Sequence, residues 1–96
     1  MNKLPQKIKI GNLIFPIKHL EESERTHYGK SSVADQRIWM STKFASDDKR
    51  NETFLHEITH VILDIGGYEK ESEDEKFVNH ISQTFYQVLK DNKLLK

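Results

Sequence analysis

The five residues His56-Glu57-Ile58-Thr59-His60 match the pattern H-E-x-x-H within a stretch that has helical periodicity. On a helix, residues four apart lie on one face with their Cβ atoms about 5–6 Å apart, so two imidazoles at this spacing can reach one metal ion. Glu57 would then lie beside the ion, where a carboxylate can accept a proton from water. The motif therefore predicts a helix here and a partner element that completes a metal site.

The residues around the motif predict a long amphipathic helix. Ser46 is a typical N-cap followed by two acids, and Gly66-Gly67 is a stop signal, so we expect a helix from about residue 47 to Ile65. At roughly 100° per residue, the two histidines lie opposite an apolar arc. That arc consists of Phe54, Leu55, Ile58, Val61, Ile62 and Ile65. The alternative is a solvated face that carries two histidines by chance. It does not explain why the apolar Leu63 lies between the two histidines when the helix is viewed down its axis.

Length and composition indicate one small domain. The 96 residues are 31% charged and 35% hydrophobic with zero net charge, and no apolar run is long enough to span a membrane. The N-terminal residues do not resemble a secretory signal, so we expect a single cytoplasmic domain over residues 1–96. Balanced charge without a basic stripe argues against a nucleic-acid partner. Because the chain has no cysteine, any metal must be held by histidine and carboxylate, the set typical of catalytic zinc.

The first half of the chain predicts a small, mainly antiparallel sheet of three or four strands. A hairpin is indicated by apolar residues that alternate on both sides of Gly11-Asn12, namely Ile8, Ile10, Leu13, Phe15 and Ile17. Pro16 has no N–H to donate, so its strand is an edge strand or Pro16 faces outward. The charged segment 19–25 predicts a loop, and two further strands follow at about 28–33 and 37–41. Large apolar side chains on both sides of the last strand predict that it is central and that Trp39 belongs to the core.

A second helix is predicted from roughly Glu73 to Asn92, after a short acidic loop. Its apolar stripe is Val78, Ile81, Phe85, Val88 and Leu89. A catalytic zinc site needs a third protein ligand besides two histidines, and it keeps one position open for water. The metzincin motif requires glycine at position 63 and histidine at 66. Since Leu63 and Gly66 occupy these positions, the third ligand should be a carboxylate of the last helix.

Several carboxylates of the last helix are candidates for this ligand. Glu71, Asp74 and Glu75 lie on or beside the side that packs against the first helix, whereas Glu73 and His80 face away. Glu75 has an alternative role, because Ser72 and Glu75 also form the S-x-x-E pattern of a capping box. The spacing leaves these alternatives open.

The run Glu75-Lys76-Phe77-Val78-Asn79-His80-Ile81-Ser82 resembles the E-x-x-A-N-x-F-A segment of the ImmA/IrrE-type zinc metallopeptidases. The resemblance covers roughly the second half of the chain; two alanines are replaced by Val78 and Ser82, and the family's L-L-x-P ending is absent. The chain also looks like the small phage-encoded members and the minimal gluzincins. In these a short twisted sheet, with an edge strand that pairs with extended substrate, precedes the H-E-x-x-H helix and a glutamate helix. The resemblance implies an α+β, zincin-like fold with Glu75 as the third ligand.

Together these inferences predict a zinc metallopeptidase. His56, His60 and Glu75 would hold one Zn²⁺ per chain, and Glu57 would act as the general base in hydrolysing peptide bonds of one or few protein substrates. By analogy the role would be regulatory or phage-related. The alternatives are a catalytically silent zinc-binding interaction module and an α+β domain with a coincidental motif. The sequence leaves open the oligomeric state and the group that stabilises the oxyanion.

Two kinds of supporting residue can also be suggested. Asp64, four residues after His60 on the same face, is a candidate to orient a ligand histidine through a hydrogen bond. His27, Tyr28 and Tyr68 are candidates to contact a developing oxyanion, although a tyrosine at the junction of a loop and a strand more often serves packing.

Overall fold

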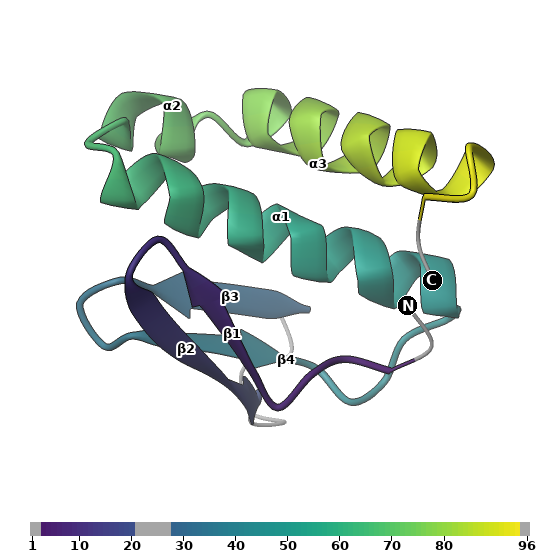
Figure 1. Cartoon of the computed structure of the whole chain (residues 1–96), viewed down its shortest axis with the longest axis horizontal. Helices are drawn as coiled ribbons and strands as arrows, with labels where there is room; N and C mark the ends of the chain where they lie inside the picture. Colours follow the sequence, from purple (N-terminus) through teal and green to yellow (C-terminus); the bar gives the residue numbers. More distant parts are fainter. Residues whose placement is uncertain (1–2, 21–27, 95–96) are drawn as a thin grey trace.

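The structure is a computed structural model that describes residues 3–20 and 28–94, and it is an α+β fold as predicted (Figure 1). The elements are β1 (Lys7–Ile10), β2 (Leu13–His19), β3 (Gly29–Ser32), β4 (Arg37–Met40), α1 (Asp47–Ile65), α2 (Glu69–Glu73) and α3 (Glu75–Asp91). Helix α1 lies between the sheet and the α2–α3 layer, so the motif helix contacts both layers. Within the described ranges, no helix is long and apolar enough to cross a membrane.

The four strands have the order β1-β2-β4-β3. The β1–β2 and β3–β4 pairs are antiparallel and the β2–β4 pair is parallel, so the sheet is mainly antiparallel and β4 is central, as predicted. Strand β2 is not an edge strand. It pairs with β1 through Pro16 and with β4 only from Ile17 onward. Pro16 is tolerated because it lies where the strand changes partner, so the missing N–H interrupts neither ladder.

The core lies between the sheet and α1. Its buried members alternate along β2 and β4 and recur at helical spacing on α1: Phe15, Ile38, Met40, Phe54 and Val61. Trp39 does not belong to this cluster, contrary to the prediction. Its side chain points to the other side of β4, where the Lys30 ammonium lies 4.8 Å from the ring centroid on the neighbouring strand.

Helix α1 has the predicted limits. The Ser46 hydroxyl accepts a hydrogen bond from the Lys49 N–H at 3.1 Å, and the chain leaves the helix at Gly67, whose φ of +81° favours glycine. The following segment was wrongly predicted as a loop, because residues 69–73 form the short helix α2. This extra turn fixes the position of the residues that precede α3.

Helix α3 begins at Glu75, and its N-cap is Asp74, which accepts a hydrogen bond from the Phe77 N–H at 3.1 Å. The capping box between Ser72 and Glu75 is therefore not formed, since the Ser72 N–H bonds the Tyr68 carbonyl inside α2. Asp74 takes the N-cap role that the capping box would give to Ser72. The Glu75 side chain is consequently available for another interaction.

The side of α3 that packs against α1 differs from the predicted apolar stripe. Val78, Ser82 and Tyr86 are its buried residues, at a spacing of four. In the predicted stripe, Val78 is buried and Leu89 is half-buried, while Ile81, Phe85 and Val88 are exposed. Helix α3 thus lies on α1 with a partly polar side, and its apolar side faces outward.

Candidate metal centre

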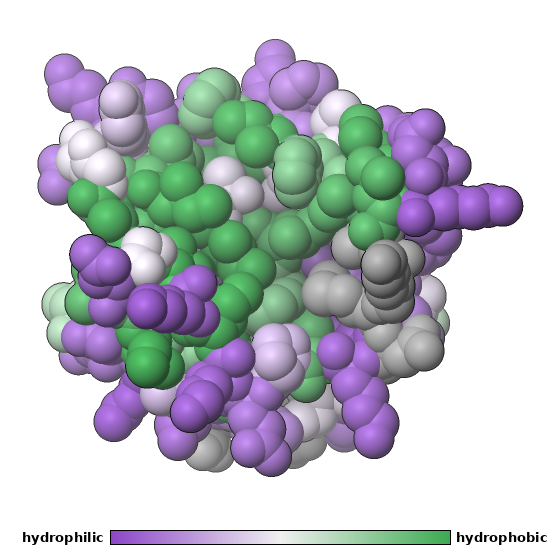
Figure 2. All heavy atoms as spheres, viewed as in Figure 1, coloured by the Kyte–Doolittle hydropathy of each residue, from purple (hydrophilic) through white to green (hydrophobic). Residues whose placement is uncertain are grey.

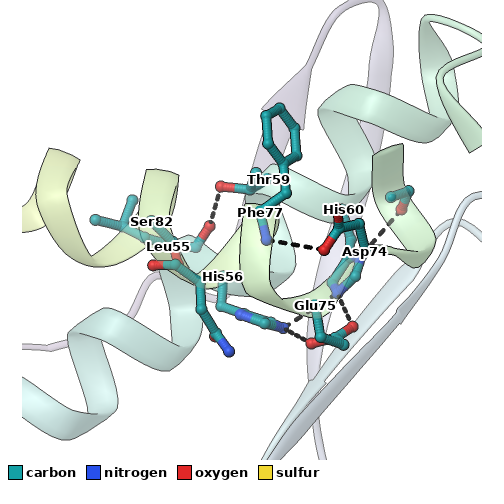
Figure 3. A network of polar contacts seen from close by, with 10 residues as sticks. Leu55, His56, Thr59, His60, Asp74, Glu75, Phe77 and Ser82 are labelled. Atoms are coloured by element: carbon teal, nitrogen blue, oxygen red, sulfur yellow. Dashed lines mark hydrogen bonds and ion pairs between the residues drawn. The ribbon is translucent and has the colours of Figure 1, made fainter. Parts of the chain in front are cut away.

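Three of the predicted ligands come together where the first turn of α3 meets the middle of α1. His56 and His60 are one helical turn apart, and both rings point toward Glu75 (Figure 3). The His56 Nε2 lies 3.1 Å from Glu75 Oε2, and the His60 Nε2 lies 3.0 Å from Glu75 Oε1. The two Nε2 atoms are 3.1 Å apart. The side chains of His56, His60 and Glu75 therefore form one cluster whose ligand atoms can reach a single metal ion.

The three ligand atoms are of the kind that binds a cation. Each neutral imidazole with its proton on Nδ1 presents a lone pair at Nε2, and a carboxylate oxygen can only accept. Three acceptors within hydrogen-bond distance of one another repel unless a proton or a positive ion lies among them. Nitrogen and oxygen ligands bind zinc at about 2.0–2.2 Å, a distance from which one ion can contact all three atoms. Two histidines and one glutamate are also a ligand set of catalytic zinc sites.

Hydrogen bonds orient both imidazoles. The His60 Nδ1 lies 2.9 Å from the Ser72 hydroxyl on α2. The tautomer that donates from Nδ1 to this oxygen leaves Nε2 free to bind a metal. Asn79, one turn after Glu75 on α3, is hydrogen-bonded to the His56 side chain. Asp64, which was predicted to orient a ligand histidine, lines a hollow beside the cluster. The partner of the His60 Nδ1 is Ser72.

Burial lowers the pKa of the His56 imidazole below its ordinary value, although the carboxylate of Glu75 and hydrogen bonds act in the opposite direction. Desolvation favours the uncharged ring, which is the form that binds a metal. His56 is therefore prepared for a cation by its surroundings as well as by its position.

Glu57 lies beside the cluster and not within it. Its side chain points toward β3 and is only 6% exposed. Burial raises the pKa of Glu57 to about 7, a shift that a hydrogen bond from Ser31 opposes and the nearby Glu75 charge increases. A carboxyl group with a pKa near neutrality can accept and release a proton at physiological pH. Glu57 therefore lies beside the cluster, as the H-E-x-x-H spacing predicts for the residue after the first histidine.

Gly29, the first residue of β3, allows this strand to approach Glu57 closely. A Cβ atom at position 29 would lie 3.2 Å from Glu57 Cγ, from Glu57 Oε2 and from Thr53 Cγ2. A larger residue would require the side chains of Glu57 and Thr53 to shift by a few tenths of an ångström. Glycine at this position therefore lets the backbone of the strand lie against the Glu57 side chain.

The cluster opens into two hollows that flank it along β3. One, of about 620 Å³, is lined by Gly29, Lys30 and Ser31 of β3 together with His60, Asp64 and Glu75. The other, of about 220 Å³, lies between α1 and α3 and is lined mainly by polar groups, among them Glu52, Thr53, Asn79 and Gln83. His56 and Glu57 border both hollows. A ligand lying along β3 would therefore pass directly over the three ligand atoms.

The remaining candidates have other positions. Asp74 caps α3, Glu71 and Glu73 are exposed on α2, and none of them joins the cluster. Tyr28 is exposed at the border of the smaller hollow, Tyr68 packs on Gly66, and His27 lies outside the described residues. The sequence analysis missed the supporting roles of Ser72, Asn79 and Ser31. Signals for the first two were present, since Ser72 belongs to the S-x-x-E pattern and Asn79 to the segment that resembles the metallopeptidases.

Comparison of the chain with models of known protein families, with curated proteins and with solved structures finds no match.

Proposed function

We propose that this protein is a zinc-dependent metallopeptidase of the H-E-x-x-H-plus-glutamate kind, related to the ImmA/IrrE-type family that its sequence resembles. The observation that carries the proposal is that His56, His60 and Glu75 come together beside a buried carboxyl group. That group belongs to Glu57, which is not one of the three candidate ligands. A site that only held an ion would not require that fourth group. The proposal includes a cytoplasmic location and a regulatory or phage-related role.

His56, His60 and Glu75 would hold the ion, which when bound supplies a water of lowered pKa and polarises the scissile carbonyl. Ser72 and Asn79 keep the two imidazoles oriented. Glu57 accepts the proton of the attacking water and then donates it to the leaving amine nitrogen. Its buried position beside the three ligands suits both steps, because the same group must be a base first and an acid afterward.

The substrate in this proposal is an extended peptide segment. Among the described strands, β3 pairs only with β4, so its other edge has backbone groups available beside the metal centre. A peptide in strand conformation can pair with such an edge by main-chain hydrogen bonds, while pockets next to it select side chains. The small volume of the polar hollow supports selectivity for one or few protein substrates.

Cleavage of a proteome-derived peptide library tests this function. The zinc-loaded protein and its Glu57→Gln variant are incubated with the library, and new peptide termini are identified by mass spectrometry. We expect selective cleavage by the wild type and a loss of roughly 10²–10⁴-fold in the variant, the usual contribution of a general base. Zinc content of both proteins serves as the control, because Glu57 is not a ligand.

Equal cleavage by wild type and variant would remove Glu57 from the mechanism. Absence of cleavage by the zinc-loaded wild type would favour the alternative, a catalytically silent zinc-binding module that recognises a protein partner. The same ligands serve both functions, so only turnover separates them.

A further inference from the structure

The outward side of α3 carries an apolar surface that the fold leaves uncovered. Phe77, Ile81, Phe85 and Val88 follow one another at helical spacing, and all four are exposed, Phe85 by 56%. The buried side of the helix, by contrast, includes the polar side chains of Ser82 and Tyr86. A helix that buries its partly polar side and exposes its phenylalanines lacks a partner for its apolar side.

Helix α1 extends this surface. Ile62 is 54% exposed and Ile65 is 41% exposed, although both belong to the apolar arc of α1, of which Phe54, Ile58 and Val61 reach the core. Figure 2 shows apolar side chains gathered on the face where α3, α1 and the β1–β2 hairpin can be seen together, with a hollow between them. We call this surface the apolar face; its residues are Ile62, Ile65, Phe77, Ile81, Phe85 and Val88.

The size of the apolar face matches the apolar part of a standard protein interface. With an aromatic side chain counted as about 150–250 Å² and the others somewhat smaller, the exposed fractions amount to roughly 400–500 Å². A standard interface buries about 800 Å² on each partner, of which about 56–58% is apolar. A partner that covered the apolar face and its polar margin would therefore bury the area that a stable complex requires.

We propose that the partner is a second copy of this chain, related by a two-fold axis that brings the two α3 helices together in antiparallel orientation. A two-fold interface must be self-complementary, and this face offers both a ridge, the side chains of α3, and a hollow beside it. Between Phe77 and Val88 the outward side of α3 carries no charged residue, since only His80 and Thr84 adjoin the stripe. Like charges are therefore not brought together in the middle of the interface.

The charges at the ends of α3 suit this arrangement. Asp74 and Glu75 lie at the N-terminal end and Lys90 lies in the last turn, so antiparallel packing places the acidic end of each helix near the basic end of the other. The two helix dipoles are also opposed. The net charge of the chain is zero, so the two copies do not repel each other at neutral pH.

The apolar face shares no residue with the linings of the two hollows at the metal centre. A dimer formed through it leaves that centre open, and the proposal does not depend on the proposed function. Its test can therefore be made with metal-free protein.

Sedimentation velocity at roughly 1 to 500 µM tests the proposal, because interfaces of this size associate at micromolar or lower concentration. We expect a concentration-dependent dimer for the wild type and at least about a 30-fold weaker association for Phe85→Glu. Ile14→Glu is the matched control, since Ile14 is 48% exposed on the side of β2 opposite the buried Phe15. Its association should remain within about 3-fold of the wild type. Far-UV circular dichroism reports whether each variant is folded.

Two variants that each carry one introduced cysteine give a second test, which does not depend on a charged substitution. The test is possible because the natural chain has no cysteine. Oxidation should give a disulfide-linked dimer for Thr84→Cys, at the margin of the stripe, and little for Asp35→Cys in the turn between β3 and β4. A wild type that is monomeric over the whole range would overturn the proposal and leave the face to an unlike partner. Equal association of the wild type and Phe85→Glu, or equal cross-linking of the two cysteine variants, would also overturn it.

Discussion

Two polar clusters join α1 to α3, one at each end of the contact, and they differ in how their hydrogen-bonding groups are matched. Near the start of α1, the Tyr86 hydroxyl accepts a hydrogen bond from Asn51 at 3.1 Å and donates one to Asp48 at 2.8 Å. Lys90 completes this cluster with an ion pair to Asp48 at 2.7 Å. At the other end, two imidazole nitrogens and a carboxylate meet at 3.0–3.1 Å, and every group is an acceptor when each neutral ring carries its proton on Nδ1.

This difference distinguishes a structural contact from a binding site. The Tyr86 cluster is complete because each donor has an acceptor, so it holds the helices together without any further ligand. The histidine–glutamate cluster presents acceptor atoms that one metal ion can bind, and its members come from two helices that the Tyr86 cluster keeps in place. We therefore expect changes in the first cluster to affect folding stability, and changes in the second to affect metal affinity.

The largest effect should come from Glu75→Ala. Loss of a direct ligand should weaken zinc binding by at least about 100-fold, since loss of a hydrogen-bond partner of a ligand typically costs 10–100-fold. Titration with a competing chelator measures this change. His80→Ala and Glu73→Ala are the controls, because both side chains are exposed and neither belongs to the cluster. An unchanged affinity in Glu75→Ala would show that Glu75 is not a ligand.

Glu57→Gln should stabilise the metal-free protein at alkaline pH. The folded protein raises the pKa of Glu57 from 4.5 to about 7, so the stability associated with the neutral carboxyl is fully present below pH 4.5 and is lost as pH rises through 7. The pKa difference corresponds to about 3 kcal/mol at most. Glutamine remains neutral, so the variant should exceed the wild type by up to that amount at about pH 8 and equal it at about pH 4. Urea unfolding at both pH values measures this, and equal stability at pH 8 would contradict it.

Ser72→Ala should weaken zinc binding by about 10-fold while leaving the ion bound. The substitution removes the hydroxyl that orients the His60 ring and sets its tautomer, but it removes no ligand. The same chelator titration measures the effect. Asp64→Ala serves as the comparison, because Asp64 lines the same hollow but does not contact the His60 Nδ1. A larger loss in Asp64→Ala than in Ser72→Ala would reverse our assignment.

Tyr86→Phe should give the smallest effect, and it should change folding stability and not zinc affinity. It removes the hydrogen bonds that the Tyr86 hydroxyl makes with Asn51 and Asp48 and should lower the free energy of unfolding by about 1–2 kcal/mol. The zinc affinity should stay within about 3-fold of the wild type, because the ring still packs between the helices. Denaturation and chelator titration on the same samples would separate the two quantities. A large loss of zinc affinity would mean that the two clusters are not independent.

More of α1 than of α3 could be predicted from the sequence, and the reason is physical. The limits of α1, its capping by Ser46 and the common face of His56 and His60 all follow from local periodicity, and all were predicted. For α3, periodicity located the apolar residues but not the side that packs, because polar contacts at both ends fix its rotation on α1. Whether Glu75 caps the helix or faces the histidines depended on α2, an element that the acidic sequence of residues 69–73 did not reveal.

The sheet gives a similar lesson. Alternation predicted the hairpin and the central position of β4, since these depend on apolar patterns within single strands. The side of β4 that faces the core could not be decided between Trp39 and its neighbours, because both sides are apolar. Glu57 shows the same limit, as its burial depends on Gly29 in a strand remote from it in sequence.

The zinc content of reconstituted protein tests most directly whether His56, His60 and Glu75 bind zinc as we propose. Metal-free protein is incubated with excess Zn²⁺, passed through a desalting column and analysed for zinc and protein. We predict one equivalent per chain for the wild type, removed by chelation, and a large loss for the His60→Ala variant under the same conditions. Less than about a tenth of an equivalent in folded wild-type protein would contradict the account.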